Sequence, residues 1–228
     1  MIDLSQVGIC LDVDGTLYPV SKWRVAWRLR KHLGLLRVMY RTREEMRTIE
    51  TSFATHHEFL EAEAGRVAEA LGMPADTVMR QLADLKLRLA EVMTKNTKPF
   101  TGARESLAWA VQQGAAVAVL SDYPPQQKLS NLGLERVGWS GCFGAEESGA
   151  LKPNSAGFQT VRASCRQNIH TWIYIGDRED TDVLGAQSSG FVPVLFSSQE
   201  PGKVPYHLSE WNLAAFQGLI GQILRSEP

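Results

Sequence analysis

The chain has 228 residues, of which 44% are hydrophobic and 21% charged, and its formal net charge is −1. The length suits one domain with a large insertion or two small domains, and the composition excludes disorder. A net charge this small excludes a strong field around the whole molecule, so we expect no nucleic-acid partner. The sequence shows no secretory signal and no apolar run that could span a bilayer, which predicts a cytoplasmic protein without stable membrane insertion.

Four short apolar runs predict strands that are buried on both faces of a parallel sheet. In chain order they span Val7–Val13, Ala115–Leu120, Thr171–Ile175 and Phe191–Phe196. Helical patterns lie between and after these runs, and several of them stop at a glycine. The predicted helices are Arg104–Gln113, Gln126–Leu132, Ser155–Arg166, Thr181–Ser189 and Leu213–Leu224. This alternation predicts an α/β fold with an open parallel-sheet, Rossmann-like core.

The segment from residue 21 to residue 97 interrupts this alternation, because it contains only helical patterns. The predicted helices are Trp23–Leu36, Arg43–Leu71 and Thr77–Met93, the last with Asp76 as its N-cap. We therefore predict a catalytic core of residues 1–20 and 98–228 and an inserted α-helical cap of residues 21–97. Hinges are expected at Tyr18-Pro19 and Lys98-Pro99, since proline fixes the backbone where the chain crosses between domains.

Polar side chains lie at or just past the carboxyl ends of three predicted strands: Asp12 and Asp14, Ser121, and Asp177. In open α/β sheets the carboxyl ends of the strands surround the ligand. Several carboxylates at one point repel each other unless a cation is bound, and oxygen ligands without histidine or cysteine favour Mg²⁺ over zinc. One of the two neighbouring aspartates could be a nucleophile and the other a proton donor and acceptor. Gly15 would allow a sharp turn and leave its N–H free for an anion.

These motifs resemble those of the haloacid dehalogenase-like (HAD) superfamily. The run Asp12-Val13-Asp14-Gly15-Thr16-Leu17 looks like its first motif, and Ser121 at a strand end matches the second. Lys152-Pro153 matches the third, and the pair Asp177 and Asp182, with four residues between them, matches a variant of the fourth. The motifs occur in the family's order and cover nearly all of the predicted core.

The resemblance implies that Asp12 attacks phosphorus to form an aspartyl phosphate, while Asp14 protonates the leaving oxygen and then activates water. It also implies that Mg²⁺ is the cofactor. The implied metal ligands are Asp12, the backbone carbonyl of Asp14, and Asp177, with Asp182 supporting the metal directly or through water. The resemblance implies that Ser121 and Lys152 contact the phosphate, and we expect Gly15, Thr16 and Asp122 beside it. For Asp122 the alternative is a role in the turn Ser-Asp-Tyr-Pro-Pro. For Asp180 the simpler interpretation is an N-cap of the helix that follows it.

The leading functional hypothesis is therefore Mg²⁺-dependent hydrolysis of a small phosphomonoester, with a small phosphorylated metabolite as the partner. Dehalogenase-like members of the family lack a carboxylate at the position of Asp14, because halide leaves without a proton. One alternative is a phosphomutase or phosphotransferase that acts on a sugar phosphate. Another is a non-catalytic binding protein that acts through a basic helix near residues 22–47. The sequence predicts no oligomeric state.

The start of the insert combines basic and aromatic residues, within the stretch 22–47. The simplest interpretation is an amphipathic helix with a solvated basic face and with Trp23 and Trp27 packed in the core of the insert. A second interpretation is a basic wall that guides an anionic substrate. A third is peripheral attachment to an anionic membrane or to nucleic acid.

Overall fold

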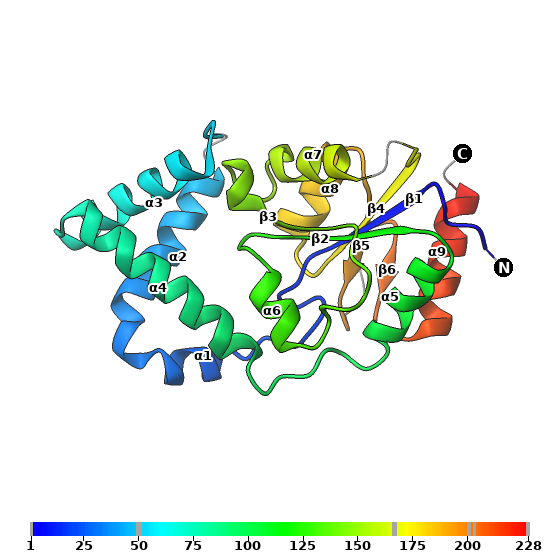
Figure 1. The fold of residues 1–228 in the computed structure, drawn as a ribbon, viewed down its shortest axis with the longest axis horizontal. Coiled ribbons are helices and arrows are strands. Elements are labelled where there is room, and N and C mark those ends of the chain that lie inside the picture. Colours follow the sequence, from blue (N-terminus) through cyan, green and yellow to red (C-terminus); the bar gives the residue numbers. More distant parts are fainter. Residues whose placement is uncertain (1, 49–51, 166–167, 200–201, 203, 227–228) are drawn as a thin grey trace.

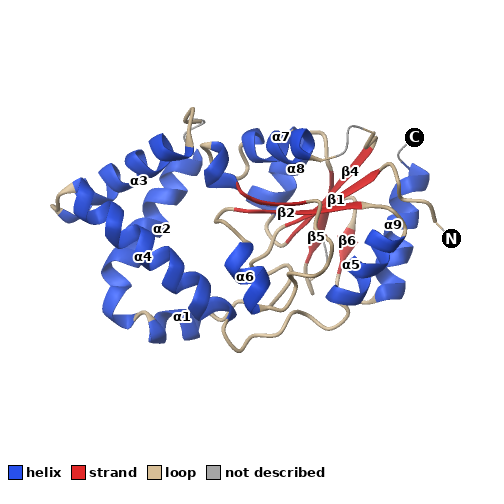
Figure 2. Ribbon diagram, viewed as in Figure 1, coloured by secondary structure: helices blue, strands red, loops and turns tan. Residues whose placement is uncertain are grey.

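The computed structural model describes residues 2–48, 52–165, 168–199, 202 and 204–226. They contain a six-stranded sheet of order β3-β2-β1-β4-β5-β6, in which every neighbouring pair is parallel. The strands are β1 (Val7–Leu11), β2 (Ala116–Ser121), β3 (Gly141–Gly144), β4 (Thr171–Gly176), β5 (Val192–Phe196) and β6 (His207–Leu208). The predicted open parallel α/β sheet is thus confirmed (Figure 2).

Strands β3 and β6 were not predicted from the sequence. The first contains two glycines in four residues, and the second has only two residues, so neither forms an apolar run. Both lie at the edges of the sheet, where a strand needs less apolar surface than in the centre. The four predicted strands are the four central ones.

Helices cover both faces of the sheet, because alternate residues of each central strand point to opposite sides. Ile9 and Val117 belong to the cluster that contains Leu107 of α5 and Phe216 of α9, whereas Cys10 belongs to the cluster of Phe158 in α7. These core helices are α5 (Ala103–Gln112), α6 (Gln126–Asn131), α7 (Ser155–Ser164), α8 (Leu184–Ser188) and α9 (Leu213–Ser226). The predicted end of α7, Arg166, lies outside the described residues.

The helices of the insert are α1 (Lys22–Arg28), α2 (Leu33–Thr48), α3 (His56–Leu71) and α4 (Ala75–Thr94). They lie together at one end of the sheet, on the left of Figure 1, and the two chain termini lie at the other end (Figure 1). The predicted single helix Trp23–Leu36 is wrong, because the short 3₁₀ turn Arg30–His32 separates α1 from α2.

Two further predictions about the insert are wrong. The stretch Arg43–Leu71 is not one helix, because α3 begins after Thr55, whose side chain accepts a hydrogen bond from the N–H of Glu58 at 3.2 Å. Glu58 in turn accepts one from the N–H of Ala54, so the sequence Thr-x-x-Glu caps the helix. Asp76 is not an N-cap either: α4 begins at Ala75, and Asp76 lies in its first turn.

Among the described residues, no helix has the length and hydropathy needed to cross a membrane.

Candidate active site

A cleft of about 460 Å³ opens where the carboxyl ends of the central strands meet the insert. The core lines it with residues that follow β1, β2 and β4, and with Lys152. The insert lines it with Lys22, Tyr40, Arg43, Glu44, Arg47 and Met93. The topology explains the position, since the chain runs from β1 outward to β2 and β3 and then returns to β4 on the other side of β1, so the strand order reverses there.

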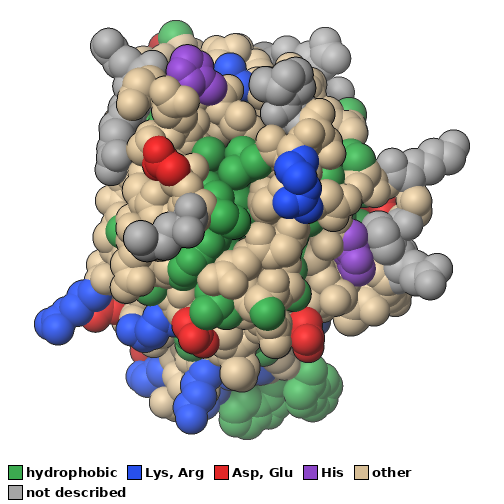
Figure 3. Space-filling view, turned by 90° about the vertical axis from the view of Figure 1, so that its right-hand side faces the viewer, with side chains coloured by type: hydrophobic (Ala, Val, Ile, Leu, Met, Phe, Trp, Pro, Cys, Tyr) green, Lys and Arg blue, Asp and Glu red, His purple; other side chains and the backbone are tan. Residues whose placement is uncertain are grey.

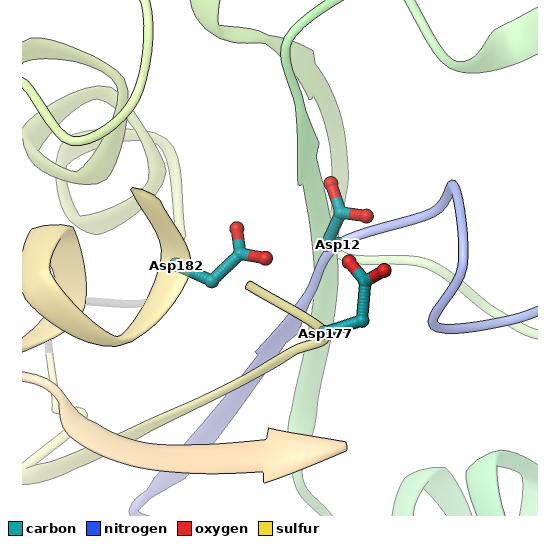
Figure 4. A group of neighbouring side chains, drawn as sticks. All are labelled: Asp12, Asp177 and Asp182. Atoms are coloured by element: carbon teal, nitrogen blue, oxygen red, sulfur yellow. The ribbon is translucent and has the colours of Figure 1, made fainter. Parts of the chain in front are cut away.

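Three carboxylates converge in this cleft. Asp12 follows β1, Asp177 follows β4, and Asp182 lies in the π-helical turn Glu179–Val183. One oxygen of each lies within 4.8 Å of the others, and Figure 4 shows the three groups turned toward a common space (Figure 4). Residues 170 positions apart in the sequence therefore provide one oxygen-rich site.

Lys152 supplies the positive charge at this point. Its buried Nζ donates to Asp12 Oδ1 and to Asp182 Oδ1, both at 2.6 Å, and to the hydroxyl of Tyr174 at 3.0 Å. Burial alone would lower the pKa of Lys152, but Asp12 and Asp182 outweigh it and raise that pKa well above its usual value. The ammonium group is therefore charged, and it holds Asp12 in one orientation.

The carboxylates remain under-compensated. Burial raises the pKa of Asp12 well above its usual value, with Asp182 and Asp14 adding to the effect of burial and Lys152 opposing it. Burial and then Asp182 raise the pKa of Asp177 to about 6. Both shifts indicate that the site favours a further cation when its carboxylates are ionised.

A divalent hard cation fits this donor set. Among the described residues, Asp12, Asp14 and Asp182 pair with two ammonium groups, those of Lys128 and Lys152, and Asp177 adds a fourth carboxylate. All the acidic groups offer oxygen, which is the ligand that Mg²⁺ prefers. Asp12 and Asp177 are the residues best placed to hold such an ion, because Asp182 already accepts from Lys152 and from the N–H of Arg178.

Asp14 is held by two side chains that the sequence analysis did not single out. The hydroxyl of Tyr18 donates to its Oδ1, and the buried Nζ of Lys128, on α6, donates to its Oδ2. Lys128 is 1% exposed, and its ammonium group lies 5.2 Å from the ring centre of Tyr123. The sequence could have indicated the pair of Lys128 and Asp14 only through a basic residue at a helix position that is expected to be buried.

Gly15 and Thr16 were expected beside the phosphate, but neither residue lines the cleft. Gly15 has φ +91°, and a Cβ there would lie 2.2 Å from Asp177 Oδ2, so the turn requires glycine. Its N–H donates to the carbonyl of Tyr18 at 3.2 Å, so the expectation of a free N–H is wrong. Thr16 is 0% exposed, and its carbonyl accepts from Trp211 Nε1 at 2.7 Å. It therefore anchors the loop to the core.

Ser121 and Asp122 follow β2 and line the cleft as predicted. The carboxylate of Asp122 already accepts from Arg47 Nη2 at 2.7 Å and from the N–H of Lys152 at 3.2 Å. Burial alone would raise the pKa of Asp122, but Arg47 and Lys152 outweigh it and hold that pKa well below its usual value. Asp122 therefore orders the Lys152 backbone and binds the insert.

Asp180 is not an N-cap. The π-helical turn begins at Glu179 with Arg178 in the capping position, and no side chain caps it. The carboxylate of Asp180 instead accepts from the guanidinium of Arg178 at 2.6 Å. Asp182, which was expected to support the metal directly or through water, is buried beside Lys152.

A second buried ionic cluster joins the insert to the core beside the cleft. Arg43 of α2 donates to Glu63 of α3 at 3.0 Å and to Glu146 of the core at 2.7 Å. Lys86 of α4 donates to the same two carboxylates at 2.7 and 3.0 Å. We call these four residues the buried cluster. The sequence showed Arg43 only as one of many basic residues, since its partners lie 20 and 103 positions away.

Comparisons with known proteins identify a family and similar folds. A family model of haloacid dehalogenase-like hydrolases matches residues 7–190. A search of curated proteins gives no match. Three similar solved structures, each 16% identical in sequence, are a 2-haloacid dehalogenase from Pseudomonas syringae pv. Tomato DC3000, the HAD-hydrolase YfnB from Bacillus subtilis bound to magnesium, and a HAD phosphatase from Thermococcus onnurineus.

The likeness extends over almost the whole length of each chain. The TM-scores are 0.64, 0.65 and 0.55 in that order. The first two matches cover 98% of this chain and 100% of the other, and the third covers 94% and 97%. At this identity the structures share the fold, while their printed activities differ.

Proposed function

Since the chain belongs to the haloacid dehalogenase-like hydrolases, we propose that it hydrolyses a small phosphomonoester, with Asp12 as nucleophile and Mg²⁺ as cofactor. The proposal rests on two neighbouring aspartates, each held by a lysine. Lys152 donates to Asp12 inside the carboxylate cluster, and Lys128 donates to Asp14, two residues further along the chain. A nucleophile and a separate proton carrier are the two functions that ester hydrolysis through a covalent intermediate requires.

The proposed mechanism has two steps. In the first, the Asp12 oxygen not bonded to Lys152 attacks phosphorus, the bond from phosphorus to the ester oxygen breaks, and Asp14 gives a proton to that oxygen. In the second, Asp14 takes a proton from water, whose oxygen attacks phosphorus and releases Asp12. Lys152 and Ser121 would stabilise the negative charge on the phosphoryl oxygens. Bound Mg²⁺ would neutralise further charge on the phosphoryl group.

Asp14 distinguishes this proposal from dehalogenation. Halide needs no proton when it leaves carbon, whereas an alkoxide leaving phosphorus does. The family resemblance links a carboxylate at this position to phosphate esters. Residues 21–97 would act as a cap over the cleft, with hinges at Tyr18-Pro19 and Lys98-Pro99, and would exclude water during the reaction.

The activity is tested by three assays on the purified chain with and without Mg²⁺. We expect phosphate release from an aryl phosphate and from members of a panel of phosphorylated metabolites, and its loss when a chelator removes the metal. Halide release from 2-chloropropionate in place of phosphate release would contradict the proposal. Isomerisation of a sugar phosphate with little phosphate release would support the phosphomutase alternative instead.

Lys128 is expected to act as a positioning residue for Asp14. Lys128→Met should lower kcat on an alkyl phosphate by about a hundredfold, with little change in KM, because general acid–base catalysis contributes about this much. The loss should be smaller on p-nitrophenyl phosphate, whose leaving group needs no proton in the first step. Lys128→Arg should restore part of the activity, and Lys95→Met, at an exposed ion pair, serves as control. Equal losses on both substrates would indicate a merely structural role.

A further inference from the structure

The surface of α1 that faces solvent combines aromatic and basic side chains. Its exposed members are Lys22, Trp23, Trp27, Arg28, Arg30 and Lys31, which we call the α1 face. None of the catalytic steps proposed above uses it. Figure 3, which views the molecule from the end that carries the chain termini, shows hydrophobic side chains projecting at the lower edge, with Lys and Arg side chains along the same edge.

The tryptophans point away from the core. Val25 and Leu29 form the inward stripe of α1 and are 9% and 3% exposed. Trp23 and Trp27, also four residues apart, lie on the opposite side and are 79% and 55% exposed. The interpretation that they pack in the core of the insert is therefore wrong. Two neighbouring tryptophans that keep most of their surface in water indicate a binding surface, because the fold gains little burial from them.

The charged residues of α1 itself have a single sign. Between Asp14 and Glu44 the sequence contains no acidic residue. The guanidinium groups of Arg28 and Arg30 lie 5.8 and 5.7 Å from the ring centre of Trp27. Beside α1, a hollow of about 180 Å³ is lined by Arg24, Arg28, His32, Arg88, Lys95 and Glu91, with two apolar residues. An anionic surface would meet cations both around the tryptophans and in this hollow.

We infer that the α1 face binds the surface of an anionic phospholipid bilayer. Tryptophan is favoured at the headgroup level, where its apolar ring meets lipid and its N–H meets water. Lysine and arginine beside it attract acidic headgroups, and their aliphatic stems can lie along the interface. The binding is peripheral, which agrees with the absence of a membrane-spanning helix among the described residues. It is independent of the catalytic proposal.

Two other occupants fit less well. A second copy of the chain docked through the same face would place like charges against each other across a twofold axis. Nucleic acid would need a groove that follows a backbone with many cations, and α1 is a single helix of seven residues on a chain of net charge −1. A fluid bilayer needs only a small protruding surface.

The test is co-sedimentation of the full chain with vesicles of phosphatidylcholine alone or mixed with phosphatidylserine. We expect binding to the mixed vesicles only, and release at high salt. Trp23→Ser with Trp27→Ser should weaken binding at least about tenfold, given the apolar area withdrawn. Arg28→Gln, Arg30→Gln and Lys31→Gln together should weaken it about a hundredfold, at roughly fivefold per cation. Leu87→Ser, at an exposed apolar site on α4, is the matched control and should bind as the wild type does.

Urea midpoints close to that of the wild type will show that these variants fold, since every changed side chain is exposed. Absence of binding to mixed vesicles would overturn the inference. So would binding that the tryptophan pair does not affect, tighter binding to a single-stranded oligonucleotide than to vesicles, or a wild-type dimer that Trp23→Ser with Trp27→Ser dissociates.

Discussion

Asp12→Asn is expected to reduce kcat on an aryl phosphate by about 10⁴-fold or more while leaving the chain folded. The amide has the shape of the carboxylate but is not a nucleophile, and removal of a catalytic nucleophile has effects of this order. Stability should not fall, because burial and neighbouring carboxylates already raise the pKa of Asp12 well above its usual value. Removing one of these repelling charges offsets the loss of its bond to Lys152. The measurements are steady-state kinetics and the urea midpoint.

Asp180→Asn is the matched control for this variant. Asp180 is an exposed aspartate of the same site region and pairs with the Arg178 side chain rather than with Lys152. Its replacement should change kcat by less than about twofold, since exposed ion pairs contribute little. If Asp12→Asn kept its activity, Asp12 could not be the nucleophile, whether or not Mg²⁺ is required.

Arg43→Met is expected to lower the free energy of unfolding by about 3–5 kcal/mol, the usual effect of removing one partner from a buried ion pair. Arg43 is 1% exposed and contacts both carboxylates of the buried cluster, Glu63 and Glu146. Without it, the two carboxylates would keep only Lys86 and, 3.8 Å from Glu146, His56 as partners among the described residues. Urea denaturation measures the change. Arg41→Met, in an exposed i,i+4 pair on the same helix, should change stability by less than about 0.5 kcal/mol.

Arg43→Met should also change how the stability of the protein depends on pH. Burial alone would raise the pKa of Glu146, but Arg43 leads the opposing interactions and lowers it to about 2. A depressed folded pKa gives stability that is present above the unfolded pKa of 4.5 and is lost as the pH falls toward 2. Arg43→Met should lose less stability across this interval than the wild type. Identical pH profiles, or identical midpoints for the Arg41 and Arg43 variants, would contradict this account of the cluster.

The sequence predicted the parts of the fold that depend on local patterns. The apolar runs of β1, β2, β4 and β5 are buried on both faces, so each strand could be recognised by itself. The edge strands β3 and β6 could not, because they bury too few apolar side chains to leave a pattern. The break between α2 and α3 was overlooked although Thr55 caps α3 by accepting from the N–H of Glu58, since the helical period continues on both sides.

The residues of the candidate site likewise divide into those that local sequence patterns indicate and those that they do not. Asp12, Ser121 and Asp177 could be grouped in advance, because parallel strands bring their carboxyl ends to one edge. Lys152 could be added only through its match to the third motif of the family. The contacts of Lys128 with Asp14 and of Arg43 with Glu146 span 114 and 103 positions and follow no motif. Trp23 and Trp27 had the right spacing for a buried stripe, and only the burial of Val25 and Leu29 shows which side of α1 faces inward.

The most direct test of the central claim is to look for the phosphoryl group on Asp12. Asp14→Asn should still be phosphorylated by p-nitrophenyl phosphate in Mg²⁺, because that leaving group needs no proton, but should lose its phosphoryl group slowly, because no base activates water. Rapid quenching and peptide mass spectrometry should then show one phosphoryl group on the peptide that contains Asp12, and none in Asp12→Asn. A phosphoryl group on any other residue, or unmodified Asp12 during continued turnover, would contradict the mechanism.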